Sequence, residues 1–306
     1  MRNIALSNFF FIIFSLFVVT FISPIISIVL GIFFASLYKV KANTISKKLS
    51  SYPLQIGIVL IGLTISSDSL LLIVQDYFIW VSFFVILSFF TCYLLGRLMG
   101  LDNKLNLLLS SGLSICGATA IAITAPLIKA KPNTLLIALA IIFIINTVAI
   151  ILFPLLGTYL NMNNDEFGIF SALAINDTGS VIGSALQFSD NSVEVATSLK
   201  ILRILWLIPL IVLLNAKFNT GNVKNSFPVF IIFFIIAVIF SNLMNLSYEV
   251  IEYLKVISKI FISYGIFSIG LQSAKLDLSD FRYKPFIVAV SVWLIVIPLA
   301  YVAAIN

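Results

Sequence analysis

Long apolar stretches separated by short polar loops make up nearly the whole sequence. The apolar stretches lie near residues 4–22, 25–38, 52–66, 77–96, 105–128, 134–156, 167–188, 195–215, 227–246, 255–272 and 285–304. Several are shorter than the ~20 residues that a straight membrane-spanning helix needs. The pattern predicts an all-α integral membrane protein with about 9–11 membrane segments.

The composition agrees with this pattern and excludes several functions. The chain is 61% hydrophobic and 10% charged, which is too apolar for a soluble domain, so we expect one polytopic membrane domain over residues 1–306. The absence of histidine removes His-ligated zinc sites and Ser-His-Asp triads. Cys92 and Cys116 both lie in apolar segments and imply no disulfide framework. We expect no enzyme activity, no metal and no cofactor. Segment 4–22 lacks a small-residue cleavage pattern, which favours a retained helix over a signal peptide.

Two apolar segments contain unusual runs of small residues, at 110–121 and 174–185. Glycines such as Gly112 and Gly117 make unwound backbone inexpensive. Unwound backbone at membrane depth is tolerated only inside protein or along a cavity. The two segments therefore predict broken helices that face something polar. A tight helix-packing interface without a ligand is the alternative interpretation.

Loop charges predict how these segments cross the membrane. Basic loops lie at 39–51, 97–104, 129–133, 216–226 and 273–284, and acidic loops without bases lie at 67–76, 157–166 and 189–194. Cytoplasmic loops collect Lys and Arg. If every segment crosses once, Lys129 and Lys131 fall outside. If 105–128 and 167–188 are re-entrant hairpins, all the basic loops fall inside and the acidic loops outside.

An internal repeat favours the re-entrant arrangement. Residues 57–63 and 265–271 agree at five of seven positions, and each copy follows a segment that begins with proline, Pro24 or Pro228. In the re-entrant topology the two copies run in opposite senses. Inverted repeats with broken helices at the bilayer midplane are typical of secondary transporters.

Asp177, Lys200 and Arg203 lie within apolar segments, where charge is costly and indicates function. Asp177 lies in the second small-residue run, and it could bind an ion, pair with a base or cap a half-helix. Lys200 and Arg203 share one helical face because they are three residues apart. A positive pair beside hydroxyl-rich broken helices suits an anion. A purely structural ion pair between Asp177 and Arg203 is the alternative.

With these residues identified, the chain resembles the YeiH-type family of bacterial membrane proteins, which are described as sulfate exporters. The resemblance covers nearly the whole chain and is strongest at residues 57–63, 114–121 and 125–131, and at the Asp177-Thr178 pair with Lys200 and Arg203. The family commonly has histidine before Asp-Thr, whereas this chain has Asn176. The resemblance implies distant kinship with sodium/proton antiporters and bile-acid transporters, which are built from inverted repeats with crossed broken helices.

We therefore expect a secondary transporter, in the bacterial inner membrane, that exports a small inorganic anion such as sulfate or a related sulfur oxyanion. The candidate substrate residues are Ser114, Cys116, Gly117, Thr119, Thr178, Ser180, Lys200 and Arg203, and the candidate coupling-ion residues are Asn176 and Asp177. The expected partners are the anion, a coupling proton or sodium ion and the lipid bilayer, without nucleic acid, and a homodimer is compatible with the sequence. A cation/proton antiporter centred on Asp177 and a non-transporting membrane scaffold are the alternatives.

Overall fold

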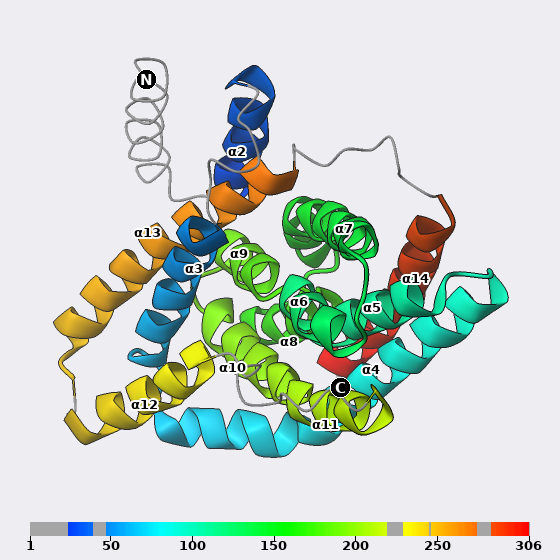
Figure 1. Ribbon diagram of the computed structural model, residues 1–306. Coiled ribbons are helices and arrows are strands. Elements are labelled where there is room, and N and C mark those ends of the chain that lie inside the picture. The colour runs from blue at the N-terminus through cyan, green and yellow to red at the C-terminus, as the bar shows by residue number, and fades with distance from the viewer. Residues whose placement is uncertain (1–23, 39–46, 219–228, 245, 274–282, 306) are drawn as a thin grey trace. The chain divides into compact units, whose positions relative to one another are not determined.

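The computed structural model describes residues 24–38, 47–218, 229–244, 246–273 and 283–305 (Figure 1). The described residues form helices and no strands, which confirms the predicted all-α class. The helices are α2 (Pro24–Tyr38), α3 (Lys47–Gly62), α4 (Ser67–Leu98), α5 (Asn103–Ser114), α6 (Ala118–Leu127), α7 (Pro132–Tyr159), α8 (Asn164–Ala174), α9 (Thr178–Phe188), α10 (Ser192–Leu205), α11 (Leu207–Phe218), α12 (Val229–Met244), α13 (Tyr248–Ser273) and α14 (Tyr283–Ile305). The expected segment 4–22 lies outside the described residues.

Four helical stretches in the described part of the chain are long enough to cross a membrane. These are Leu70–Leu98, Asn133–Tyr159, Ser192–Phe218 and Tyr283–Ile305, each long and apolar enough to span a bilayer. Large apolar side chains such as Phe90 and Leu213 remain exposed on these helices, as expected for surfaces that face lipid.

The chain divides into two compact units, residues 1–66 with 233–276 and residues 67–232 with 277–306. In the first unit the two repeat copies pack against each other through α3 and α13. A Cβ atom on Gly57 would lie 2.6 Å from Ile262 Cγ1, and one on Gly265 would lie 2.8 Å from Leu54 Cβ. Position 57 thus faces 262 while the equivalent position 265 faces 54. This reciprocal pairing is what inverted repeats produce when the two helices pass in opposite senses.

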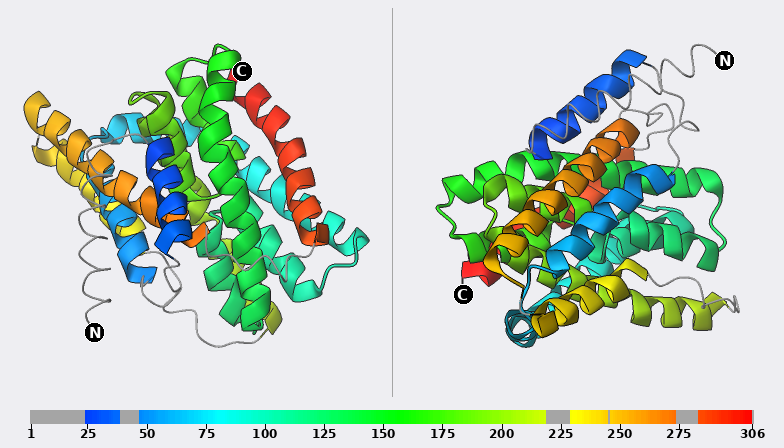
Figure 2. Two further views of the ribbon diagram at one scale, coloured as in Figure 1. Left: turned by 90° about the horizontal axis from the view of Figure 1, so that it is seen from above. Right: turned by 90° about the vertical axis from the view of Figure 1, so that its left-hand side faces the viewer.

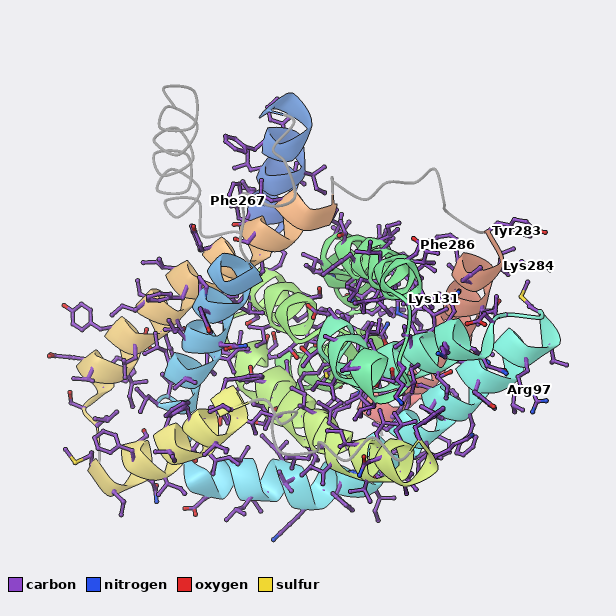
Figure 3. The ribbon with its side chains drawn as sticks, viewed as in Figure 1. Arg97, Lys131, Phe267, Tyr283, Lys284 and Phe286 are labelled. Carbon is purple, nitrogen blue, oxygen red and sulfur yellow. The ribbon has the colours of Figure 1, made fainter. Side chains whose placement is uncertain are left out.

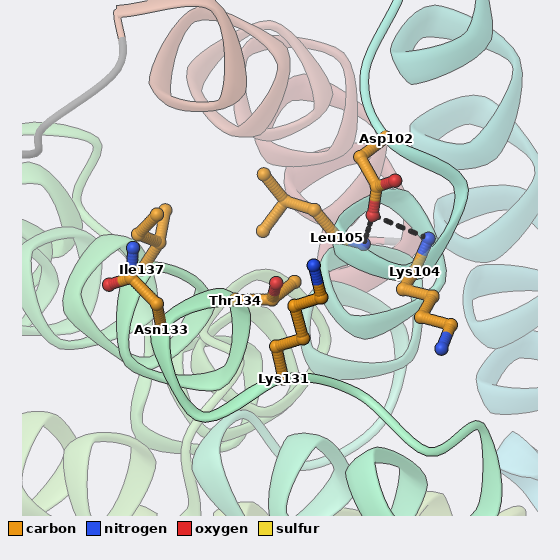
Figure 4. Close-up of a pocket in the computed structure, with 7 residues that line it drawn as sticks. All are labelled: Asp102, Lys104, Leu105, Lys131, Asn133, Thr134 and Ile137. Atoms are coloured by element: carbon orange, nitrogen blue, oxygen red, sulfur yellow. Dashed lines mark hydrogen bonds between the residues drawn. The ribbon is translucent and has the colours of Figure 1, made fainter.

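The second unit contains α4 to α11 and α14, and its centre is a pair of helical hairpins. The first hairpin consists of α5 and α6. Its two ends lie side by side, since Lys104 Nζ donates a 2.7 Å hydrogen bond to the carbonyl of Lys129. The segment 105–128 therefore enters and leaves at the same end of the unit. Figure 4 shows the pocket at this open end, where Asp102 caps α5 by accepting hydrogen bonds from Lys104 N and Leu105 N.

The second hairpin consists of α8 and α9 and opens at the opposite end. Phe167, near the start of α8, stacks on Phe188, at the end of α9, with ring centroids 4.1 Å apart. Helix α7 follows the first hairpin and precedes the second, and its 28 residues extend roughly 42 Å between the two open ends. The views in Figure 2 show α7 as a long helix beside the shorter hairpin helices. Both re-entrant hairpins agree with the topology predicted from loop charge.

Two boundaries differ from the expected ones. Residues 67–76, expected as an acidic loop, form the first turns of α4, where Asp68 lies in the first turn and complements the helix dipole. The segment 195–215, expected as one helix, is divided at Trp206 into α10 and α11. Pro209 contributes to this break because its ring cannot donate an N–H to the preceding turn.

Candidate functional site

The tips of the two hairpins meet in the interior of the second unit. The first tip is the unwound stretch 115–117 between α5 and α6, and the second is 175–177 between α8 and α9. A Cβ atom added to Gly117 would lie 3.2 Å from both Cα and Cβ of Asp177. The crossing therefore places the ends of four half-helices close together: the C-termini of α5 and α8, and the N-termini of α6 and α9.

Glycine is required at the first tip for its backbone conformation as well as for space. Gly117 has φ 61° and ψ −121°, a conformation that side chains strongly disfavour. Its N–H donates to the carbonyl of Gly112 at 2.9 Å, which closes the end of α5.

Lys200 and Arg203 of α10 are bound to the C-terminal ends of both α5 and α8. Lys200 Nζ donates to the carbonyls of Ile115 and Ile175, each at 3.0 Å, and to the carbonyl of Asn176. The Arg203 guanidinium donates to the carbonyls of Leu113, Ser114, Ala172, Leu173 and Ile175, at 2.7–3.3 Å. Both side chains are fully buried. Each carbonyl left without a partner at membrane depth would cost several kcal/mol, so these two cations stabilise the broken helices.

Trp293 of α14 completes the set of donors at the end of α8. Its Nε1 donates to the carbonyl of Ala174 at 2.9 Å, and its ring stacks on Phe153 with centroids 5.2 Å apart. Each carbonyl from residue 172 to 176 consequently accepts a side-chain hydrogen bond. Trp293 could not be recognised from the sequence, because nothing in its own segment indicates a hydrogen-bond partner on a distant helix.

The N-termini of α6 and α9 differ in charge. Asp177 caps α9, where its Oδ2 accepts hydrogen bonds from Ser180 N at 3.1 Å and Ser180 Oγ at 3.2 Å. The N-cap of α6 is Gly117, which offers no side chain, and the first turn of α6 contains no acid. The N-cap residue of α6 therefore provides no side-chain acceptor for the N–H groups that begin the helix, and these groups carry the positive end of its dipole.

Asn146 of α7 is a second site residue that sequence reasoning missed. Its Oδ1 accepts a 3.4 Å hydrogen bond from Asp177 N, while its Nδ2 is buried without a partner in the described part of the chain. Asn176 Nδ2 is buried and unpaired in the same way. A single asparagine inside the apolar segment 134–156 was the available signal, since polar side chains at membrane depth are costly.

The structure brings all the predicted site residues to this crossing or to α10 behind it. Ser114, Cys116, Thr178 and Ser180 are buried, whereas Thr119 and Asp177 are only half-buried. The Ser114 hydroxyl donates back to the carbonyl of Ser111 at 3.3 Å. Within the described residues no salt bridge joins Asp177 to Lys200 or Arg203, and no group of three or more acidic or Cys residues could hold a metal ion. The roles assigned to these residues in substrate and ion binding stay predictions.

Known proteins similar to this chain are described as membrane proteins. The sequence matches the family described as "Conserved hypothetical protein 698" over residues 4–289. A "UPF0324 membrane protein" of Shewanella oneidensis is 34% identical over 292 residues, which cover 92% of this chain and 90% of that one. Proteins of the same description are 31% identical in Bacteroides thetaiotaomicron, over 90% of this chain and 84% of that one, and in Photobacterium profundum, over 94% and 89%. No solved structure matches the chain. The resemblance to the YeiH-type proteins is thus confirmed, and the chain belongs to this family of bacterial membrane proteins.

Proposed function

We propose that this protein is a secondary transporter of the bacterial inner membrane that exports a small inorganic anion, such as sulfate or a related sulfur oxyanion. The observation that carries the proposal is the meeting of two re-entrant hairpin tips that open at opposite ends of one unit. Unwound backbone at this depth occurs where it lines a cavity, and inverted repeats with such breaks are the architecture of secondary transporters.

The charge balance at the crossing favours an anion. Lys200 and Arg203 contribute two positive charges and Asp177 contributes one negative charge. A helix end carries about half a unit charge, positive at the N-terminus and negative at the C-terminus. The two N-termini, of α6 and α9, therefore cancel the two C-termini, of α5 and α8. A net positive field remains at the tips. Because each side-chain nitrogen of both cations already donates to a carbonyl, we assign them an effect through this field, without direct contact to the anion.

The direct donors in this proposal are groups that remain available at the crossing. The N-terminal N–H groups of α6 and the half-buried Thr119 hydroxyl lie at the first tip, and Asn146 Nδ2 and Asn176 Nδ2 are unpaired. Helix N-termini and amide donors suit a tetrahedral oxyanion. Ser114, Cys116, Gly117, Thr178 and Ser180 would shape the site around them.

The open end of the first hairpin suits an entrance for anions from the cytoplasm. Its pocket, of about 310 Å³, is lined by Lys104, Lys131, Asn133 and Thr134 among others (Figure 4). Figure 3 places Arg97, Lys131 and Lys284 around this part of the unit. The positive-inside rule assigns these lysines to the cytoplasm, where they would raise the local anion concentration.

A cation/proton antiporter is the second candidate, favoured by the half-buried Asp177 carboxylate without a salt bridge at the crossing. In the anion-transport proposal the same carboxylate binds the coupling proton or sodium ion. The two candidates differ in what moves with the proton.

Flux in proteoliposomes tests the proposal. We expect uptake of labelled sulfate driven by a proton or sodium gradient, reduced several-fold by Thr119→Val, which keeps the shape of the side chain and removes the hydroxyl. Thr158→Val, at an exposed position near the end of α7 and away from both the crossing and the entrance pocket, is the matched control. Sodium-driven proton movement without anion dependence would replace the proposal with the antiporter, and no flux of either ion would favour the scaffold.

A further inference from the structure

A groove on the outside of the second unit reaches the first hairpin tip only at its inner end and has no role in the proposed transport. It lies between α4, α5 and α11, encloses about 340 Å³, and has walls formed mainly by apolar side chains such as Ile86, Phe89, Phe90 and Leu213. Ile86, Phe90 and Leu213 are among the exposed apolar residues, so the groove opens to the outside of the unit. A groove of this kind on a membrane protein faces the hydrocarbon of the bilayer.

The two ends of the groove differ chemically. Lys217, an exposed residue in the last turn of α11, lies at one end with Tyr93 of α4, whose ring stacks on Phe89. Trp206 lies at the other end with Ser114 and Ile115, the last residues of α5 and the start of the first tip. Among the residues that the structure describes, those that line the groove include no acid. The groove therefore joins a cation near the loops to the interior of the unit.

The length of the groove matches one leaflet of a bilayer. Lys217 lies eleven positions after Trp206, which corresponds to roughly 16 Å of helix. Tyr93 lies eight positions after Val85 in α4, or roughly 12 Å. Half of a hydrocarbon core is about 15 Å thick. The loop after α11 belongs to the basic set, so Lys217 would lie at the cytoplasmic surface, where anionic lipid headgroups concentrate.

We infer that this groove binds one acyl chain of an anionic phospholipid, with the phosphate of the lipid on Lys217. The chain lies along the aromatic and aliphatic walls and ends near Trp206. At that depth it contacts the residues whose carbonyls bind Lys200 and Arg203, namely Ile115 and Ser114. Occupancy by this lipid therefore supports the packing of the first hairpin tip.

Trp206 provides a native reporter for the lipid. The purified protein is reconstituted in vesicles that contain either brominated phosphatidylglycerol or brominated phosphatidylcholine at equal density, and tryptophan fluorescence is measured. The contribution of Trp206 is the difference between the unmodified chain and Trp206→Phe. We expect the anionic lipid to be preferred at Trp206 by about fivefold, the factor that one lysine contributes at a membrane surface.

Lys217→Gln should abolish this preference, whereas Lys131→Gln, at an exposed lysine outside the groove, should leave it unchanged. Both substitutions are at exposed positions, so the fold is retained. Equal quenching by the two lipids would overturn the inference, as would a preference that survives in Lys217→Gln. Absence of quenching at Trp206 by either lipid would show that protein, such as a second copy of the chain, fills the groove. None of these readings depends on transport, so the inference and the proposed function can fail separately.

Discussion

Gly117 lies where the tip of the first hairpin closely approaches Asp177 at the tip of the second. We predict that Gly117→Ala destabilises the protein by about 1–2 kcal/mol from its positive φ alone, with a further loss from the contact with Asp177. Thermal unfolding in detergent measures the total loss of stability, and a control glycine with positive φ separates the two contributions. Gly100→Ala is the matched control, because Gly100 also has a positive φ of 71°, and no atom of the described residues lies within 4 Å of an added Cβ. Equal destabilisation by both changes would show that the close approach to Asp177 contributes nothing.

We expect Arg203 to stabilise the fold, so that its loss lowers the stability of the protein as well as transport. Arg203→Met removes the donors to five carbonyls at the ends of α5 and α8, so we predict a loss of at least about 3 kcal/mol of stability. The measurement is the melting temperature and yield of folded protein, beside Arg97→Met at an exposed site. A variant as stable as the unmodified chain would show that water or other donors replace the guanidinium.

At the scale of residues, the sequence identified the members of the site better than their partners. Asp177, Lys200 and Arg203 were identified because charge inside an apolar segment is rare. The acceptors of the two cations could not be predicted, because they are backbone carbonyls and any residue type supplies one. Asn146 and Trp293 were missed for a related reason: each acts on a segment far away in sequence.

At the scale of elements, loop charge predicted the two hairpins. A single crossing by segment 105–128 would have placed Lys129 and Lys131 outside, whereas a hairpin returns the chain to the cytoplasmic side. Small residues identified the breaks themselves. The break at Trp206 has no small residues around it, and Pro209 was the available signal. The start of α4 at Ser67 was missed because acids were assigned to a loop, although an acid in a first turn stabilises a helix.

The hairpin topology predicts that Lys131 and Asn191 face opposite sides of the membrane. We expect Lys131→Cys to react with a membrane-impermeant maleimide only after cells are permeabilised, and Asn191→Cys to react in intact cells. Lys284→Cys, whose residue lines a pocket with Asp102 at the same end, should behave like Lys131→Cys. Cys92 and Cys116 are buried and should stay unlabelled. Labelling of Lys131→Cys and Asn191→Cys from one side would contradict the hairpins.

At the scale of the whole molecule, transport requires that anion movement and ion movement be coupled, and Asp177 is the group we assign to that coupling. Asparagine caps helices as well as aspartate does, so Asp177→Asn should keep the N-terminus of α9 intact while it removes the charge. We predict that sulfate exchange between equal concentrations persists in this variant. Accumulation driven by an ion gradient should fall by about tenfold or more, because a carboxylate at membrane depth is the group that can take up the coupling ion.

Asp165→Asn is the matched control for this prediction, because Asp165 is an exposed acid in the first turn of the other second-hairpin helix, α8. It should leave both exchange and accumulation unchanged. If Asp177→Asn instead abolishes exchange while the protein stays folded, the carboxylate belongs to the anion site itself. If accumulation persists undiminished, the coupling ion binds elsewhere and Asp177 serves only as the cap of α9. Exchange and accumulation measured in the same vesicles therefore separate the three roles open to Asp177.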